Sequence, residues 1–79
     1  MVHELKILPE YYKAIINGQK TFEIRFNDRD FRVGDTLLLK EWDGKKYTGR
    51  IVERKVSYLL DDSSGYVLDG YVVMSLRRG

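Results

Sequence analysis

The sequence contains no cysteine and only one histidine, one proline and one tryptophan. Without cysteine, the chain can form neither a disulfide nor a thiolate metal site. The single histidine, His3, leaves no histidine cluster for zinc and no histidine-based catalytic triad. Any catalysis would have to use lysine, tyrosine, threonine, serine and carboxylate side chains, and we expect no metal and no cofactor.

Long apolar runs are also missing. No run approaches the roughly 20 residues of a membrane-spanning helix, and the opening MVHELKIL lacks the basic region and cleavage site of a signal peptide. We therefore expect a cytoplasmic protein that does not enter a membrane. The 79 residues, 43% hydrophobic and 33% charged, predict one globular domain over residues 1–79, and we expect a monomer.

The excess of positive charge is small. The formal net charge is +2 and the pI is about 8.9, a weaker bias than that of a dedicated nucleic-acid-binding domain. The composition therefore permits a polyanionic partner such as RNA without requiring one.

The hydrophobic pattern predicts one early helix among several short strands. Pro9 suits a first helical position, Glu10 suits the first turn, and Asn17-Gly18 is a typical helix end. The alternation of apolar and polar residues, with an Asp-Gly turn and a bulge in the longest run, predicts strands at residues 3–8, 20–26, 36–42, 47–60 and 70–77.

Five strands in so short a chain cannot form two full sheets, and a barrel leaves few exposed edges. We therefore predict an α+β, mainly β fold: a small mixed barrel, closed or nearly closed, whose helix plugs one end or covers one side. In the second predicted strand, the alternation places Phe22, Ile24 and Phe26 on the inward face and turns Glu23 and Arg25 the other way.

Two short motifs carry a resemblance to a known family. Residues 18–25 match Gly-x-Lys-x-x-Glu-x-Arg, and residues 31–35 form an aromatic-x-x-Gly-Asp turn. Together they resemble the ASCH domains, small barrels of the PUA-like superfamily, and the whole chain is similar to a compact ASCH-like family of unknown function in bacteria and phages. The resemblance implies a cleft where the helix meets the second strand, with RNA or a nucleotide as its ligand.

The first motif gathers charged side chains beside this expected cleft. Arginine supplies a planar fork for an anion, and a carboxylate can accept a hydrogen bond from a base amino group. From spacing alone, the alternative is a solvated strand face bearing an exposed ion pair. We predict that the ligand is contacted by Lys20, Thr21, Glu23, Arg25, Asp28 and Arg29.

A second basic segment surrounds the predicted hairpin and its two aromatic residues, Trp42 and Tyr47. Basic residues interleaved with aromatic ones are typical of single-strand platforms, which suggests an outer contact. Alternatively, Trp42 and Tyr47 form a cross-strand pair and the lysines keep the hairpin edge soluble. The basic residues are Lys45, Lys46, Arg50, Arg54 and Lys55.

Two other functions stay open. One is a hydrolase acting on an acylated-cytidine type of nucleoside or on RNA, with Lys20 and Glu23 as proton-transfer groups. The related ASCH amidohydrolases use a lysine, a threonine three residues later and a distant glutamate; here that threonine position is Glu23, so we expect binding rather than catalysis. The other is a protein-interaction adaptor, which predicts an exposed apolar patch outside the cleft.

Overall fold

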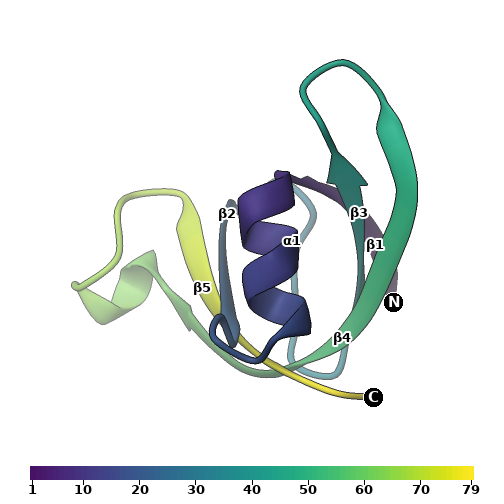
Figure 1. Cartoon of the computed structure of the whole chain (residues 1–79). Helices are drawn as coiled ribbons and strands as arrows, with labels where there is room; N and C mark the ends of the chain where they lie inside the picture. Colours follow the sequence, from purple (N-terminus) through teal and green to yellow (C-terminus); the bar gives the residue numbers. More distant parts are fainter.

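The five predicted strands and the early helix are all present in the computed structural model, which describes residues 1–79. The fold is mainly β with one α-helix, as predicted. In chain order the elements are β1 (Val2–Ile7), α1 (Pro9–Ile16), β2 (Phe22–Phe26), β3 (Thr36–Trp42), β4 (Tyr47–Asp61), the 3₁₀ helix η1 (Asp62–Ser64) and β5 (Tyr71–Arg77) (Figure 1).

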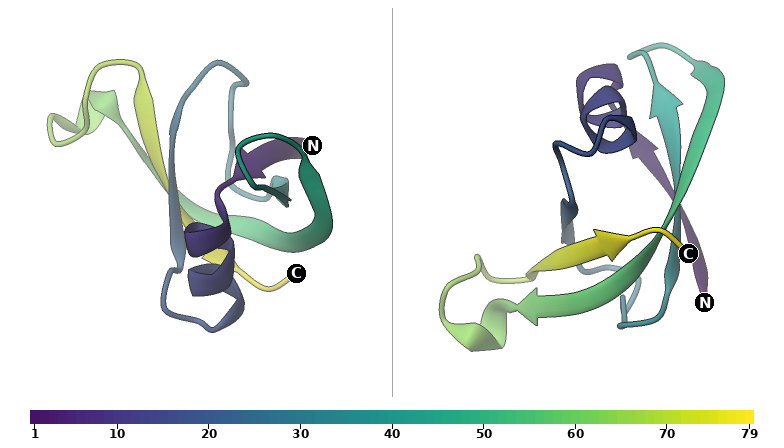
Figure 2. Two further views of the ribbon diagram at one scale, coloured as in Figure 1. Left: turned by 45° about the horizontal axis from the view of Figure 1, so that its top comes forward. Right: turned by 60° about the horizontal axis from the view of Figure 1, so that its bottom comes forward.

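All five strands belong to one mixed sheet in the order β1-β3-β4-β5-β2. The β1–β3 pair is parallel, and the other three pairs are antiparallel. The long strand β4 pairs with β3 along its first part and with β5 along its second, so its curvature bends the whole sheet (Figure 2). A register shift between Val56 and Tyr58 confirms the bulge predicted in this strand.

The sheet curls into a half-barrel and stays open between its edge strands, β1 and β2. It is therefore less closed than the barrel expected from the sequence. Arginine side chains span the open seam where backbone pairing would close a barrel: Arg25 Nη2 donates to Lys6 O at 2.5 Å, and Arg29 Nη1 donates to Glu4 O at 2.6 Å. These bonds satisfy two carbonyl groups of the β1 edge that no strand pairs with.

The core lies on the concave side of the sheet, where α1 crosses the opening (Figure 1). Ile15 is the buried residue of α1, and Tyr12 packs beside it against the core. The buried apolar residues are Leu5, Ile7, Ile15, Phe31, Leu37, Leu39, Val52, Val56, Val72 and Met74.

A buried polar cluster fixes the start of β1 against the turn before β3. His3 Nε2 lies 2.8 Å from Asp35 Oδ2, and Asp35 also accepts from the Arg32 backbone N–H and the ammonium of Met1. Burial acts to raise the pKa of the Asp35 carboxyl, but these hydrogen bonds outweigh it and hold the pKa below its usual value. His3, the first residue of the first predicted strand, lies in the edge strand β1 and is buried.

The faces of β2 are the reverse of the prediction. Antiparallel pairing sets Glu23 opposite Met74 and Arg25 opposite Val72, and both partners on β5 are fully buried. Because directly opposed residues share a face, Glu23 and Arg25 turn inward and the apolar set of β2 turns outward. The alternation of β2 correctly predicts two different faces, but its register with β5 decides which of them packs against the core.

Candidate functional site

The end of α1 places the first charged group of the site. Asn17 caps the helix, and Gly18 follows with φ +82°, a left-handed conformation that favours glycine. The backbone N–H of Lys20 then donates to Ala14 O at 2.9 Å, across the last turn. These bonds hold Lys20 beside the helix end, directly before β2.

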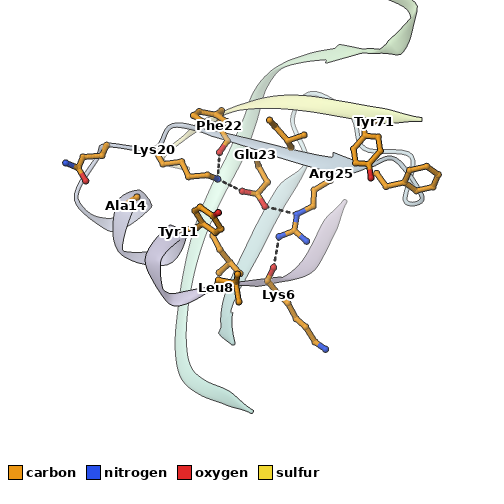
Figure 3. Close-up of a pocket in the computed structure, with 13 residues that line it drawn as sticks. Lys6, Leu8, Tyr11, Ala14, Lys20, Phe22, Glu23, Arg25 and Tyr71 are labelled. Atoms are coloured by element: carbon orange, nitrogen blue, oxygen red, sulfur yellow. Dashed lines mark hydrogen bonds and ion pairs between the residues drawn. The ribbon is translucent and has the colours of Figure 1, made fainter. Parts of the chain in front are cut away.

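Three charged side chains converge at this junction (Figure 3). Lys20 Nζ lies 2.6 Å from Glu23 Oε1, and Arg25 Nε lies 2.6 Å from Glu23 Oε2. Glu23 is only 5% exposed, so the solvated ion pair offered as the alternative is not what forms. We call Lys20, Glu23 and Arg25 the charged triad; it contains two cations around one buried carboxylate.

The triad forms one side of a cleft of about 740 Å³ that follows the open seam of the half-barrel. A volume of this size suits a small organic ligand. Lys20 Nζ lies 5.0 Å from the Phe22 ring centroid and 5.8 Å from that of Tyr11, so a cation sits beside an aromatic wall. The other lining residues are Lys6, Ile7, Leu8, Ala14, Gln19, Glu23, Ile24, Arg25, Phe26 and Tyr71.

The triad keeps unused hydrogen-bond donors. Lys20 Nζ donates to Glu23 and to Phe22 O, which uses two of its three N–H groups. Arg25 donates through Nε to Glu23 and through Nη2 to Lys6 O, while its Nη1 has no protein partner. The cleft can therefore offer donors from two cations to an acceptor-rich ligand, while Glu23 holds both cations in place.

Three other predicted contacts lie outside the lining of the cleft. Thr21 is exposed, and its carbonyl accepts from Leu76 N of β5. Asp28 and Arg29 follow β2 in an exposed turn, and Arg29 is held by the carbonyl of Glu4. Half of the six predicted contacts therefore meet in one cleft.

Several lining residues were not predicted, among them Lys6, Tyr11 and Tyr71. Tyr11 and Ala14 are three residues apart in α1 and so lie on the same face of the helix, a spacing from which a shared surface could have been predicted. Lys6 and Tyr71 come from β1 and β5, strands that only tertiary folding brings to this seam. No sequence pattern links them to the motif.

The second basic segment does not form a single surface. Trp42 and Tyr47 are directly paired, with ring centroids 5.0 Å apart at 73°, which confirms the cross-strand pair. Lys6 Nζ lies 4.1 Å from the Trp42 ring and Lys40 Nζ lies 4.5 Å from the Tyr47 ring. Both rings of the pair are thus in contact with lysines from neighbouring strands.

The remaining basic residues are divided among separate places. Arg50 pairs with the buried Glu41 at 3.2 Å. Arg54 Nη2 reaches Ile15 O of the helix at 3.5 Å on the concave side. Lys45 and Lys46 stay exposed at the hairpin tip, where an outer contact with a ligand's phosphates remains a prediction.

Two further features bear on the kind of site. No group of three or more histidine, aspartate and glutamate side chains could hold a metal ion. Neither helical segment has the length and apolar character needed to cross a membrane.

Fold and site together define a small β-rich half-barrel with a charged cleft at its open seam. The chain belongs to the family described as "Domain of unknown function (DUF3850)", whose model matches residues 2–76. It is 37% identical over 73 residues to an "Uncharacterized 12.9 kDa protein in GpA 3'region" of Escherichia phage P2. That match covers 92% of this chain, and the chain spans 65% of the phage protein's length.

Proposed function

We propose that the cleft binds a nucleotide, either free or as a unit of single-stranded RNA. The observation that carries this proposal is the convergence of Lys20 and Arg25 on the buried Glu23, beside an aromatic wall. A nucleotide combines the two matching parts: phosphate or carbonyl oxygens for the free donors, and a flat base for the aromatic rings. The cleft volume of about 740 Å³ leaves room for both.

The role of each residue follows from its bonds. Glu23 fixes the two cations, so their side chains lose little freedom when a ligand arrives. Arg25 presents its unpartnered Nη1, and Lys20 its third N–H, to oxygen atoms of the ligand. Tyr11 and Phe22 offer ring faces and edges to the base.

On the basis of the motif at residues 18–25, we also propose that the chain is related to the ASCH and PUA-like domains. We propose that it acts in the cytoplasm. The motif supplies the whole triad, and its Gly18 adopts the left-handed conformation that ends α1. A bacterial or phage RNA is the corresponding ligand.

Two observations weigh against the hydrolase alternative. Thr21, the hydroxyl nearest the motif lysine in sequence, is exposed and outside the cleft lining. Each oxygen of Glu23 is held in an ion pair with Lys20 or Arg25, which assigns the carboxylate to positioning these two cations. We therefore propose binding without turnover.

The proposal is tested by titrating isotope-labelled protein with mixed nucleotides and with single-stranded RNA, at about 50 mM and about 200 mM salt. We expect chemical-shift changes at Lys20 and Arg25 and weaker binding at the higher salt. A charge-assisted hydrogen bond contributes about 1.5–3 kcal/mol, so Lys20→Ala should weaken binding roughly 10- to 100-fold. Lys13→Ala is the matched control, since Lys13 is an exposed lysine of α1 outside the cleft lining and the basic segment, and it should weaken binding far less.

Three results would contradict this proposal. If no nucleotide or RNA shifts the triad resonances, or if Lys13→Ala weakens binding as much as Lys20→Ala, the cleft is not the binding site. In a parallel assay on acylated cytidine and on RNA, turnover that disappears in Lys20→Ala would replace binding by hydrolysis as the function.

A further inference from the structure

The outward turn of β2 leaves a large apolar surface uncovered. Six large side chains on β2, β4 and β5 are each between 36% and 65% exposed, and Val73 lies half-buried among them. We call this surface the outer apolar face. Its members are Phe22, Ile24, Phe26, Tyr58, Leu60, Tyr71 and Val73.

Strand register makes these residues one continuous face. The paired positions form three rows across the three strands: Phe22–Ser75–Tyr58, Ile24–Val73–Leu60 and Phe26–Tyr71. No member of these rows carries a charge. A contiguous apolar area on the surface of a small protein commonly marks an interaction site.

The size of this face is close to what a protein interface needs. An aromatic side chain has roughly 150–250 Å² of surface, so the four aromatic members, each between 39% and 65% exposed, give roughly 300–500 Å², and Ile24 and Leu60 add to this area. A stable interface buries about 800 Å² per partner. Tyr66 and Leu68, 91% and 77% exposed in the adjoining loop beside Tyr71, extend the face toward that value.

Opposite charges stand at the two ends of the face. Asp62 of η1 and Asp69 of the loop before β5 lie at one end, while the far end of β5 carries Arg77, paired in register with Lys55. Neither Asp69 nor Arg77 forms an ion pair within the chain. A two-fold axis that runs along the middle row, across the strands, reverses the strand direction of the second copy. It would therefore place the acidic end of one copy over the basic end of the other.

From the uncharged centre, the area and this end-to-end polarity, we propose that the outer apolar face binds a second copy of the same chain in a two-fold dimer. Nothing in the three rows repels its own copy, and the charged ends match only when the copies run in opposite directions. The dimer differs from the monomer expected from the sequence. The dimer is inferred without the nucleotide proposal, but the two sites share Phe22, Ile24, Phe26 and Tyr71, which also line the cleft.

A nucleic acid fits this face less well than a second copy. The three rows hold no lysine or arginine for phosphates. The middle row, formed by Ile24, Val73 and Leu60, is aliphatic and offers no ring on which a base could stack. One cation lies beside a ring of the face: Lys20 Nζ is 5.0 Å from the Phe22 centroid, at the end that borders the cleft.

The test is the molar mass of the full chain as a function of concentration, measured by light scattering and sedimentation without ligand. We expect a rise from 9.3 kDa toward twice that mass. Ile24→Lys and Tyr58→Lys should each raise the dissociation constant at least about 30-fold, the effect of losing a central interface contact. Ile51→Lys is the matched control: it changes the same residue type, also 53% exposed and in a strand, but outside the face.

Thermal melting of each variant, monitored by circular dichroism, separates loss of the dimer from loss of the fold. Tyr58 does not line the cleft, so Tyr58→Lys tests the face without changing the proposed nucleotide site. The proposal is overturned if the wild-type protein stays monomeric at millimolar concentration, or if Ile51→Lys dissociates the dimer as readily as Ile24→Lys. Single-stranded RNA that perturbs Tyr58 in a monomeric protein would instead assign the face to nucleic acid, and would also overturn it.

A charge swap tests the two-fold arrangement. Asp69→Arg and Arg77→Asp should each weaken the dimer, because each change sets like charges against one another. The double variant Asp69→Arg/Arg77→Asp should recover wild-type affinity. If the two single losses add in the double variant, the ends do not meet as proposed and the two-fold arrangement is wrong.

Discussion

Glu23→Gln separates a buried charged triad from an ordinary surface ion pair. The substitution keeps the shape of the side chain but removes the negative charge between Lys20 and Arg25, each 2.6 Å from it. Two cations then share a partly enclosed site with only a neutral amide. We expect the folded state to lose stability, because the remaining charges are no longer compensated.

The expected loss of stability depends on how exposed the three side chains of the triad are. Removing one partner of a fully buried pair costs about 3–5 kcal/mol, whereas a surface pair contributes about 0–1 kcal/mol. The Glu23 side chain is 6% exposed, while those of Lys20 and Arg25 are 17% and 27% exposed. An intermediate loss of about 2–3 kcal/mol is therefore expected, which for a domain of this size lowers the melting temperature by roughly 10–20 °C.

The assay is urea and thermal unfolding monitored by circular dichroism. Glu4→Gln is the matched control, since Glu4 forms an exposed ion pair with Lys40 at 3.0 Å and should lose less than about 1 kcal/mol. If Glu23→Gln loses no more than Glu4→Gln, the triad is effectively solvated and the reasoning from burial is refuted.

A triple replacement then distinguishes stability from function. Lys20→Met/Glu23→Leu/Arg25→Met exchanges the triad for apolar residues of similar length, a change that is commonly neutral or stabilising for buried ion pairs. We expect a folded protein that no longer binds nucleotides or RNA. Unchanged ligand binding in this variant would remove the triad from the proposed function.

Two further outcomes follow from local geometry. Because the pKa of Asp35 is lowered in the folded protein, its ionised carboxylate stabilises the fold above the unfolded-chain pKa of about 4. This stabilisation is lost as the pH falls through the lower folded pKa. Urea unfolding between about pH 2 and pH 5 should therefore show an acid-induced loss of stability that Asp35→Asn diminishes. Gly70→Ala would place a Cβ 2.6 Å from the Phe26 ring at a residue with φ +81°, so it should destabilise by more than the about 1–2 kcal/mol of left-handed strain. Gly65→Ala, with φ +82° and open space around it, should show the strain alone, and equal losses for the two variants in urea unfolding would contradict the contact.

Local sequence patterns were enough to predict the elements. The end of α1 at Asn17-Gly18 follows from backbone conformations that few residues other than glycine adopt. The Trp42–Tyr47 pair follows from the Asp-Gly turn between them, because a short hairpin turn fixes which residues face each other. These features depend on neighbours in the chain, so no tertiary information was needed.

Three of the six predicted contacts line the cleft, because these charges of the motif lie within six residues of one another. The helix end and a short strand place Lys20, Glu23 and Arg25 together locally. Arg29, whose contact with a ligand stays a prediction, lies outside the cleft lining and spans the seam by donating to the Glu4 carbonyl. That role requires the β1 edge to lie beside β2, which the sequence does not encode locally.

The sequence by itself determined where this chain forms strands and a helix, because apolar spacing and glycine positions act over a few residues. Only the tertiary structure decided which face of β2 is buried. Val72 and Met74 of β5 already occupy the core, and the register opposite them turns Glu23 and Arg25 inward while Phe22, Ile24 and Phe26 turn outward. Alternation specifies that a strand has two different faces, but long-range pairing selects the one that meets the core.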